Sequence, residues 1–289
     1  MNSNIVVGAD IGGSHITAAL IDLQTHAILP GSLTRRSVNA KADANKVIHE
    51  WATVILKCKT FYPVTSNRVG MAMPGPFDYE NGISLIKGVD KYEQLFQLNV
   101  KELLANALGI VEEDIFMMND ASCFLKGELF GGAARDMRSV NVTGITLGTG
   151  LGSASFTDGV LHEGDLYCTP FKEGFAEDYL SARWFVQQYK IRTGIQCNNV
   201  KEICEQVPHD AIAASLFAAF GRHLAEVLIG YIETNKAGAV VIGGNIANAW
   251  DLFIPETKTL LQSQSVKTVL LKSLLGEESA LLGAASLCI

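Results

Sequence analysis

The sequence contains two similar glycine-tipped segments that lie 136 positions apart, and this repeat constrains the possible fold more than any other feature. The first segment runs from Val6 to Asp22 and the second from Val142 to Asp158, with five identical residues among seventeen. Each consists of an apolar strand, a glycine turn, a second apolar strand and an aspartate. One such β-hairpin in each half predicts a duplicated domain with a ligand cleft between the halves.

Strand-like and helix-like patterns alternate along the rest of the chain, which predicts an α/β fold. We expect strands at Ile5–Ala9, Ile16–Asp22, Ala27–Thr34, Arg68–Met73, Ile115–Met118, Val140–Leu147, Ser153–Thr157, Ala239–Ile242 and Val266–Leu271. We expect helices at Ala42–Lys59, Val100–Leu108, Ser122–Phe130, Glu177–Arg192, Asp210–Thr234, Ala247–Gln262 and Glu277–Leu287.

The composition limits the partners and the location of the protein. Lys and Arg total 23 and Asp and Glu total 30, so the net charge of −7 argues against binding to nucleic acid or to an anionic membrane. The N-terminus has no signal-peptide pattern, and the richest apolar run, Ile212 to Phe220, is shorter than the ~20 residues of a membrane helix. The six cysteines are scattered without a Cys-x-x-Cys motif, as is typical of reduced thiols. We therefore expect a soluble cytoplasmic protein.

The two glycine turns are candidate phosphate-binding sites. Asp10-Ile-Gly12-Gly13-Ser14 and Gly148-Thr149-Gly150-Leu-Gly152 place small residues at strand-to-strand turns, where backbone N–H groups can approach a polyanion. Neither turn is a Walker loop or a dinucleotide fingerprint, because no Lys-Ser/Thr and no helix follows. A single glycine turn is more often just a tight hairpin, but two in register favour phosphate binding.

Two further segments follow predicted strands. Gly243-Gly244 ends one strand and opens a helix, which is a common position for nucleotide contacts or simply a tight connection. Asn119-Asp120 ends another strand immediately before a helix. Asp120 is therefore either the N-cap of that helix or a general base at the rim of the cleft.

The order and spacing of these motifs, together with Pro74-Gly75-Pro76, resemble the ROK family (repressor, open reading frame, kinase). The resemblance extends from Val6 to Ala285. It implies a two-lobed, actin-like ATPase fold of the ribonuclease H-like type, with a duplicated βββαβα-type core and a central cleft. The implied lobes are residues 1–118, completed by a C-terminal helix at about 276–289, and residues 119–275.

The resemblance also implies roles for individual residues. Asp10, Gly12, Gly13 and Ser14 match the first phosphate loop, with Asp10 near a magnesium ion, whereas Gly148, Thr149, Gly150 and Gly152 match the second. Gly243 and Gly244 match the adenosine motif. Gly75 lies in the loop that closes on the sugar, Asn119 and Glu177 match ligands of sugar hydroxyls, and Asp120 matches the catalytic base.

One segment departs from the family pattern. Many members hold a structural zinc ion with an upstream His and three cysteines, but here only Cys168 is retained, because Pro170 and Phe175 replace the other two. His162 lies too close to Cys168 to be the usual ligand, and one thiol cannot form a tetrahedral site. We therefore predict no zinc site. The sugar-contact segment near His162 is also altered, so the resemblance does not identify the sugar.

By this resemblance the protein is an ATP-dependent sugar kinase that uses Mg²⁺ and transfers phosphate to a hexose or N-acetylhexosamine, with Asp120 as base. A homodimer is the family-level expectation. Two alternatives remain: a sugar-binding protein that has lost catalysis, and a kinase for a non-sugar acid or polyol. A transcriptional repressor is disfavoured, because no DNA-reading segment precedes the first strand, which begins near Ile5.

Overall fold

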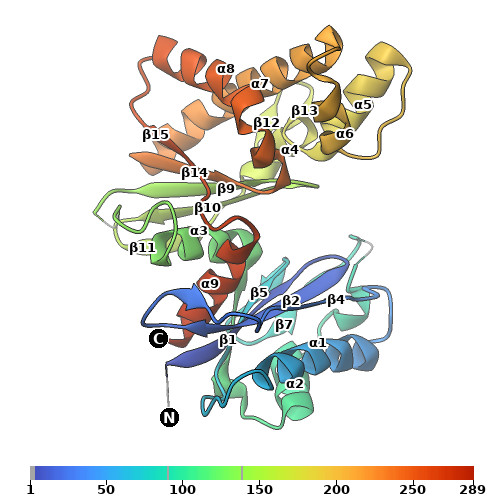
Figure 1. The fold of residues 1–289 in the computed structure, drawn as a ribbon, viewed down its shortest axis with the longest axis vertical. Coiled ribbons are helices and arrows are strands. Elements are labelled where there is room, and N and C mark those ends of the chain that lie inside the picture. Colours follow the sequence, from blue (N-terminus) through green and yellow to red (C-terminus); the bar gives the residue numbers. More distant parts are fainter. Residues whose placement is uncertain (1–3, 90, 138) are drawn as a thin grey trace. The chain divides into compact units, whose positions relative to one another are not determined.

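The structure is a computed structural model that describes residues 4–89, 91–137 and 139–289. Its contacts divide the chain into two compact units, each with its own sheet and hydrophobic core (Figure 1). Unit 1 comprises Met1–Arg135 and Glu277–Ile289, and unit 2 comprises Asp136–Gly276. The two units are described separately below.

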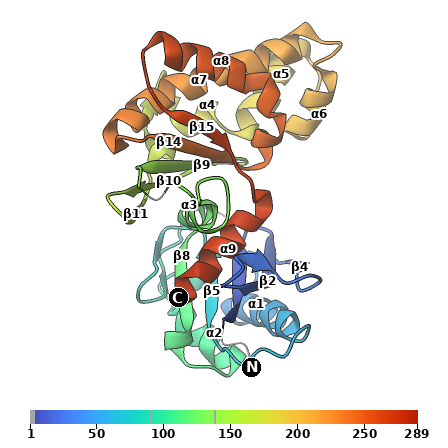
Figure 2. The same cartoon turned by 60° about the vertical axis from the view of Figure 1, so that its left-hand side comes forward.

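Unit 1 is built on a mixed sheet with helices on both faces (Figure 2). The strand order is β3-β2-β1-β5-β8, and β4 also pairs with β2. Its main elements are β1 (Ile5–Ile11), β2 (His15–Asp22), β3 (Ala27–Ile28), β4 (Thr34–Ser37), α1 (Ala44–Lys59), β5 (Val69–Met73), α2 (Val100–Leu108), β8 (Ile115–Asn119), α3 (Asp120–Phe130) and α9 (Ser279–Ala285). Helices α1 and α2 pack on one face, and α3 and α9 lie on the other.

Helix α9 packs closely against the sheet and against α3, because a glycine lies at each of these two contacts. A Cβ atom at Gly70 would lie 1.9 Å from the Ala284 carbonyl oxygen, and one at Gly283 would lie 1.8 Å from the Cys123 carbonyl oxygen. Neither position has room for a side chain. The C-terminal segment is therefore an integral layer of unit 1.

Unit 2 repeats the strand order of unit 1. Its sheet runs β11-β10-β9-β14-β15, with an antiparallel hairpin followed by parallel strands, as in β3-β2-β1-β5-β8. The strands are β9 (Val142–Leu147), β10 (Leu151–Thr157), β11 (Val160–Glu163), β14 (Ala239–Gly243) and β15 (Val269–Lys272). The helices over one face are α5 (Ala182–Thr193), α6 (Val200–Gln206), α7 (Ala211–Asn235) and α8 (Trp250–Ser263) (Figure 1). The duplication predicted from the repeat is confirmed.

Helix α7 matches the helix expected at Asp210–Thr234 to within one residue at each end. Among the described residues it is the one helix with the length and hydropathy to cross a membrane, with a mean hydropathy of 1.5 over 18 residues. Half of that window is buried inside the protein, and Leu216, Phe220 and Leu224 belong to the core of unit 2. Its apolar character is thus explained by packing within the unit.

Several predicted elements differ in detail from the structure. The strand expected at Ala27–Thr34 is split into β3 and β4, because Pro30 and Gly31 form a turn between them. The helix expected at Glu177–Arg192 is broken at Leu180-Ser181 into α4 (Ala176–Tyr179) and α5. The helix expected at Ala247–Gln262 begins as a 3₁₀ turn, Asn245–Ala249, before α8.

The boundary between the units also falls later than the predicted lobe boundary at residue 118. Helix α3 packs against α9, so residues 119–135 associate with unit 1. Glu277–Ile289 also form part of unit 1, and the lobe bounds implied by the resemblance remain a prediction.

Candidate functional site

In unit 1, the predicted site residues lie at one edge of the sheet. Strands β1, β5 and β8 are parallel neighbours, with Asp10 paired to Ala72 and Met73 paired to Asn119. Because the carboxyl ends of parallel strands meet at the same edge, this register brings Asp10, the Gly75 loop and Asn119-Asp120 together. The strand order therefore assembles three motifs that lie more than forty residues apart in the sequence.

The first glycine turn joins β1 to β2 through three residues, Gly12, Gly13 and Ser14. The Gly12 N–H donates to the His15 carbonyl at 2.8 Å, which closes the turn. Gly13 and Ser14 are exposed. A Cβ at Gly13 would find only ordinary contact, with its nearest neighbour at 3.6 Å, so packing within the fold does not require glycine there.

The structure decides which of the two adjacent residues caps α3. Asn119 is the N-cap, and its Oδ1 accepts from the backbone N–H groups of Ala121 at 2.9 Å and Ser122 at 3.2 Å. Asp120 is the first residue of the helix, and its Oδ1 accepts from Ala121 N–H at 2.8 Å. The Asp120 side chain remains accessible to solvent. The capping interpretation of Asp120 is therefore wrong, because Asn119 performs that role.

The carboxylates of Asp10 and Asp120 influence each other. Asp10 is partly buried on β1, and this burial, together with the negative charge of Asp120, raises its pKa to about 7. The pKa of Asp120 is also raised, because the surrounding protein partly desolvates the carboxylate although part of the side chain remains accessible. Raised carboxylate pKa values in one cluster are typical of groups that take up protons or bind cations.

Tyr79 links Asn119 to the loop that contains Gly75. The Asn119 Nδ2 donates to the Tyr79 hydroxyl at 3.3 Å, and that hydroxyl donates to the Met73 carbonyl at 3.3 Å. A Cβ at Gly75 would lie 3.1 Å from the same hydroxyl. Because Asn119 Oδ1 is occupied by the helix cap, its amide is oriented to offer N–H donors on the side of this loop. No sequence motif had singled out Tyr79.

In unit 2, the second glycine turn joins β9 to β10 through Gly148, Thr149 and Gly150, which is the same turn length as in unit 1. A Cβ at Gly148 would meet no atom within 4 Å, so the fold leaves open space there. Gly244 is different: it has φ +84°, and a Cβ on it would lie 2.4 Å from the Leu147 carbonyl oxygen. The backbone conformation and this close approach explain Gly244, whereas neither accounts for glycine at position 148.

The structure places Glu177 beside the second glycine turn. Its Oε2 accepts from the Leu151 N–H at 3.0 Å, and its Oε1 accepts from Arg183 at 2.9 Å. A Cβ at Gly150 would lie 2.6 Å from Glu177 Oε2. Strand pairing of Gly243 with Thr146 brings the Gly243-Gly244 motif to the same place. Unit 2 therefore gathers its predicted residues, Gly148, Thr149, Gly150, Gly152, Glu177, Gly243 and Gly244, around one turn.

The segment that departs from the zinc pattern is a short hairpin of β12 (Pro170–Phe171) and β13 (Gly174–Phe175). An aromatic cluster packs against it: the Phe171 ring lies edge-on to Tyr179 at 5.2 Å and to His223 at 5.7 Å. The Lys172 ammonium lies 5.1 Å from the centre of the Phe171 ring, and burial lowers the pKa of His223 to about 4. Ring packing thus holds this hairpin immediately before Glu177.

The described residues contain no group of three or more His, Cys, Asp or Glu side chains that could hold a metal ion, and Cys168 is exposed. The prediction that this segment binds no zinc remains a prediction.

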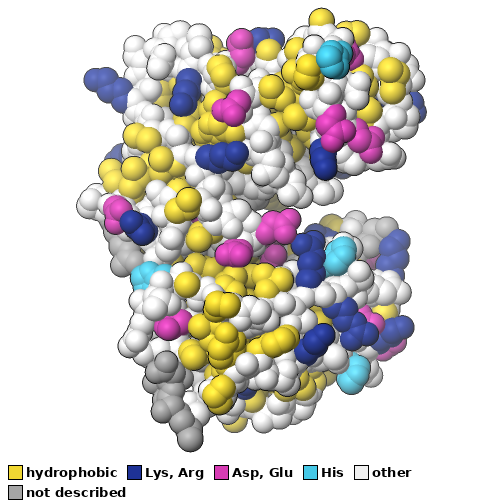
Figure 3. All heavy atoms as spheres, viewed as in Figure 1, with side chains coloured by type: hydrophobic (Ala, Val, Ile, Leu, Met, Phe, Trp, Pro, Cys, Tyr) yellow, Lys and Arg dark blue, Asp and Glu magenta, His cyan; other side chains and the backbone are white. Residues whose placement is uncertain are grey.

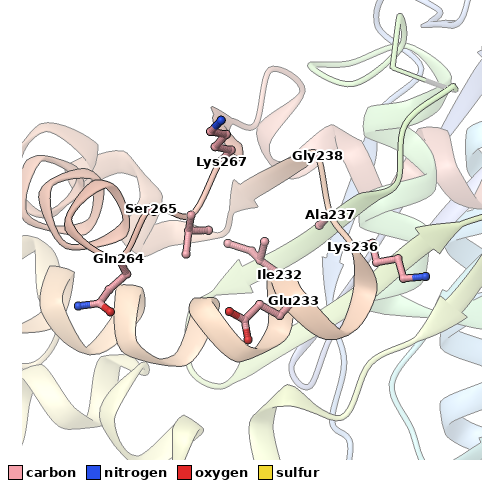
Figure 4. A pocket seen from close by; sticks show the side chains of 9 residues that line it. Ile232, Glu233, Lys236, Ala237, Gly238, Gln264, Ser265 and Lys267 are labelled. Atoms are coloured by element: carbon pink, nitrogen blue, oxygen red, sulfur yellow. The ribbon is translucent and has the colours of Figure 1, made fainter.

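A surface hollow of about 370 Å³ in unit 2 is distinct from these motifs (Figure 4). It lies between the end of α7 and the connection from α8 to β15, and Glu233, Lys236 and Lys267 are among its lining residues. Gly238 lines it immediately before β14, whereas Gly243-Gly244 lie at the other end of that strand. The hollow is therefore not the predicted nucleotide position.

Charged side chains of both signs are visible on one face of the protein (Figure 3). On the face seen in Figure 3, acidic and basic side chains both occur on each unit. This face lacks the broad basic surface expected for nucleic-acid binding, which agrees with the net charge of −7.

Comparisons with known proteins agree with this architecture. The chain is 25% identical to a glucokinase from Thermotoga maritima, over 98% of this chain and 96% of the relative. It is 23% identical to an N-acetyl-D-glucosamine kinase from Mannheimia succiniciproducens, over 98% of this chain and 99% of the relative.

Solved structures share the fold at lower identity. A ROK family glucokinase from Streptomyces griseus, in complex with glucose and AMPPNP, has a TM-score of 0.78 and 21% identity, over 98% of both chains. A ROK family transcriptional regulator has a TM-score of 0.82 and 19% identity, over 98% of this chain and 77% of the regulator.

The duplicated sheets and glycine-tipped hairpins define an α/β protein of the actin-like ATPase fold class. The ROK family model matches residues 6–289. The chain therefore belongs to the ROK family, and among its relatives are sugar kinases as well as a regulator.

Proposed function

We propose that this protein phosphorylates the 6-hydroxyl of a hexose or N-acetylhexosamine with ATP. The observation that carries the proposal is the position of Asp120. Because Asn119 caps α3, the Asp120 carboxylate is not needed for the cap and stays accessible beside Asp10 and the first glycine turn. A raised pKa suits a group that accepts a proton near neutral pH. Asp120 would take the proton of the sugar hydroxyl as its oxygen attacks the terminal phosphorus of ATP.

Nucleotide binding is supported by the two glycine turns. Gly13 and Gly148 lie where a side chain would meet little or nothing, so the space beside them is available to a ligand. Backbone N–H groups at such turns can contact phosphate oxygens. We assign ATP contacts to Asp10, Gly12, Gly13 and Ser14 in unit 1. In unit 2 we assign them to Gly148, Thr149, Gly150, Gly152, Gly243 and Gly244.

The residues at the edge of unit 1 fit a magnesium ion. Burial and, after it, the negative charge of Asp120 raise the pKa of Asp10 to about 7, and a bound divalent cation would offset both effects. Asp10 would hold Mg²⁺, directly or through a water or phosphate oxygen. When bound, the ion would supply positive charge that neutralises the phosphates.

Four groups are assigned to the sugar, as the family resemblance implies. We assign the sugar hydroxyls to Asn119, through its N–H donors, to Asp120, to the Gly75 loop and to Glu177. Glu177 already accepts from Leu151 N–H and Arg183, which fixes its carboxylate for such contacts. A cytoplasmic location and a homodimer complete the proposal, as family-level expectations.

A screen for ADP release over a panel of sugars tests this function. Sugar-dependent ADP release by the wild-type protein supports the kinase. Sugar binding without ADP release would instead support the non-catalytic alternative, and release with a small acid or polyol alone would support the non-sugar kinase.

The nucleotide assignment has its own test in Gly148→Ala. This substitution fills open space, so the melting temperature should stay within about 2 °C of wild type, while the Kd for ATP rises at least tenfold. Gly230→Ala, on α7, is a matched control, because a Cβ there also meets nothing within 4 Å. Unchanged ATP binding in Gly148→Ala would contradict the assignment.

A further inference from the structure

Lys91 lies beside the first glycine turn, although no motif in the sequence singles it out. The next residue, Tyr92, fixes this part of the chain. Tyr92 is buried, its hydroxyl donates to the Gly12 carbonyl at 2.6 Å, and its N–H donates to the Ala40 carbonyl at 2.7 Å. Its ring packs edge-on against Trp51 at 5.3 Å. Tyr92 therefore ties the backbone next to Lys91 to the turn.

The Lys91 side chain extends along Gly13. Its Cδ lies 3.6 Å from the position that a Cβ at Gly13 would occupy, and the residue is partly buried. This is the usual arrangement of a lysine whose apolar stem packs on the protein while its ammonium stays in water. The stem is thus held against the turn that we assign to phosphate.

The Lys91 ammonium also acts on Asp120. Its positive charge opposes the effect of burial and lowers the pKa of that carboxylate. Arg35 is a further cation near this edge; its charge acts on Asp10, but it forms an ion pair with Glu277 at 3.1 Å. Lys91 is therefore a cation held beside the glycine turn whose charge also acts on the candidate base.

We propose that Lys91 is a catalytic residue that binds the terminal phosphate of ATP and stabilises the charge on the transferred phosphoryl group. This inference rests on the proposed kinase function. In the transfer, the sugar oxygen forms a bond to the terminal phosphorus as the bond from that phosphorus to the bridging oxygen breaks. The bridging oxygen keeps the electron pair and leaves on ADP, and the sugar proton passes to Asp120. Lys91 stays protonated and donates hydrogen bonds throughout.

Lys91→Met tests the inference, because methionine keeps an unbranched stem over Gly13 and loses only the ammonium. We expect the Kd for ATP to rise about tenfold, with the Kd for ADP changed less than threefold, because ADP lacks the terminal phosphate. We expect kcat to fall about 10²-fold, the size of effect typical for loss of one group that stabilises transition-state charge. Lys91→Arg should recover part of both losses, since it restores the charge.

Lys87→Met is the matched control. Lys87 lies only four residues away, is exposed, and its ammonium rests 5.2 Å from the centre of the Phe96 ring. This variant should keep wild-type kcat and ATP affinity. Melting temperatures of the Lys91 and Lys87 variants should agree within about 2 °C, which confirms that Lys91→Met is folded.

The outcomes separate this inference from the proposed function. Equal weakening of ATP and ADP binding in Lys91→Met, or unchanged ATP affinity, would overturn the role of Lys91 whatever the activity. A wild-type protein that releases no ADP with any sugar would refute the kinase function, while the difference between ATP and ADP binding would still decide whether Lys91 binds the terminal phosphate.

Discussion

Asp120→Asn and Asn119→Ala separate catalysis from helix capping, because the structure assigns the two tasks to different residues. The Asp120 carboxylate accepts a hydrogen bond from the Ala121 N–H at 2.8 Å, and an asparagine oxygen can accept the same bond. Because its raised pKa means that the fold disfavours the charged carboxylate, Asp120→Asn should leave the free energy of unfolding unchanged or raise it. Loss of the base should lower kcat by about 10²- to 10⁴-fold, equivalent to ~2.7–5.4 kcal/mol in the barrier.

The neighbouring substitution should give a clear stability loss instead. Asn119→Ala removes the acceptor of two backbone N–H groups, at 2.9 and 3.2 Å, so it should cost ~0.5–2 kcal/mol. In a unit of this size that corresponds to a fall of about 1–8 °C in melting temperature.

The assays are ADP release with the sugar identified in the screen, nucleotide binding and thermal unfolding. Asp120→Asn should still bind ATP, because both glycine turns are intact. If Asp120→Asn keeps more than a tenth of wild-type kcat, Asp120 is not the base. If it instead unfolds several degrees lower than Asn119→Ala, our description of the cap is incorrect.

Three further predictions concern stability and metals. In magnesium-free buffer, Asp10 should lower the free energy of unfolding as pH rises from about 4 to about 7, because its pKa is raised and the fold favours its protonated form. Urea unfolding at a series of pH values should therefore show a smaller pH dependence in Asp10→Asn, with a difference of at most ~4 kcal/mol. Because Pro170 and Phe175 replace two cysteines of the family's zinc motif, elemental analysis of the purified protein should find well under one zinc ion per chain. Chelation should not lower the melting temperature once magnesium is restored, and stoichiometric zinc would contradict the prediction. Gly283→Ala should lower the free energy of unfolding by ~3 kcal/mol or more, because its Cβ would lie 1.8 Å from the Cys123 carbonyl oxygen. Gly230→Ala should cause no loss of stability, and a tolerated Gly283→Ala would show that α9 can shift away from α3.

The architecture could be predicted from the sequence where the signal is periodic. Alternating apolar residues and glycine turns repeat in both halves, so the pairs β1-β2 and β9-β10 and the duplication follow from local pattern, whereas the sheet order depends on long-range pairing of β5 and β14. Element ends were less predictable. The break at Leu180-Ser181 has no proline or glycine to mark it, and the amphipathic pattern continues across it.

Only the site residues that belong to recognisable sequence motifs could be predicted. Asn119 and Asp120 are both good capping residues, and only the backbone conformation, with Asn119 at φ −54° and ψ 143°, shows which one precedes the helix. Lys91 and Tyr79 lie in loops between motifs, where their contacts depend on tertiary packing. A lysine next to an aromatic residue that starts a short helical turn carries no sequence signal for proximity to Gly13.

The dependence of unit 1 on α9 has a consequence during protein synthesis. Unit 2 is continuous in sequence, so all of it is synthesised before residues 277–289. At about 5–20 residues per second, the 141 residues from 136 to 276 take roughly 7–28 s to translate. For that interval the nascent unit 1 lacks the helix that packs on Gly8 and Gly70, so the sheet face that α9 shares with α3 is only partly covered. Unit 1, although first in the sequence, should therefore complete its native packing only after all of unit 2 has been synthesised.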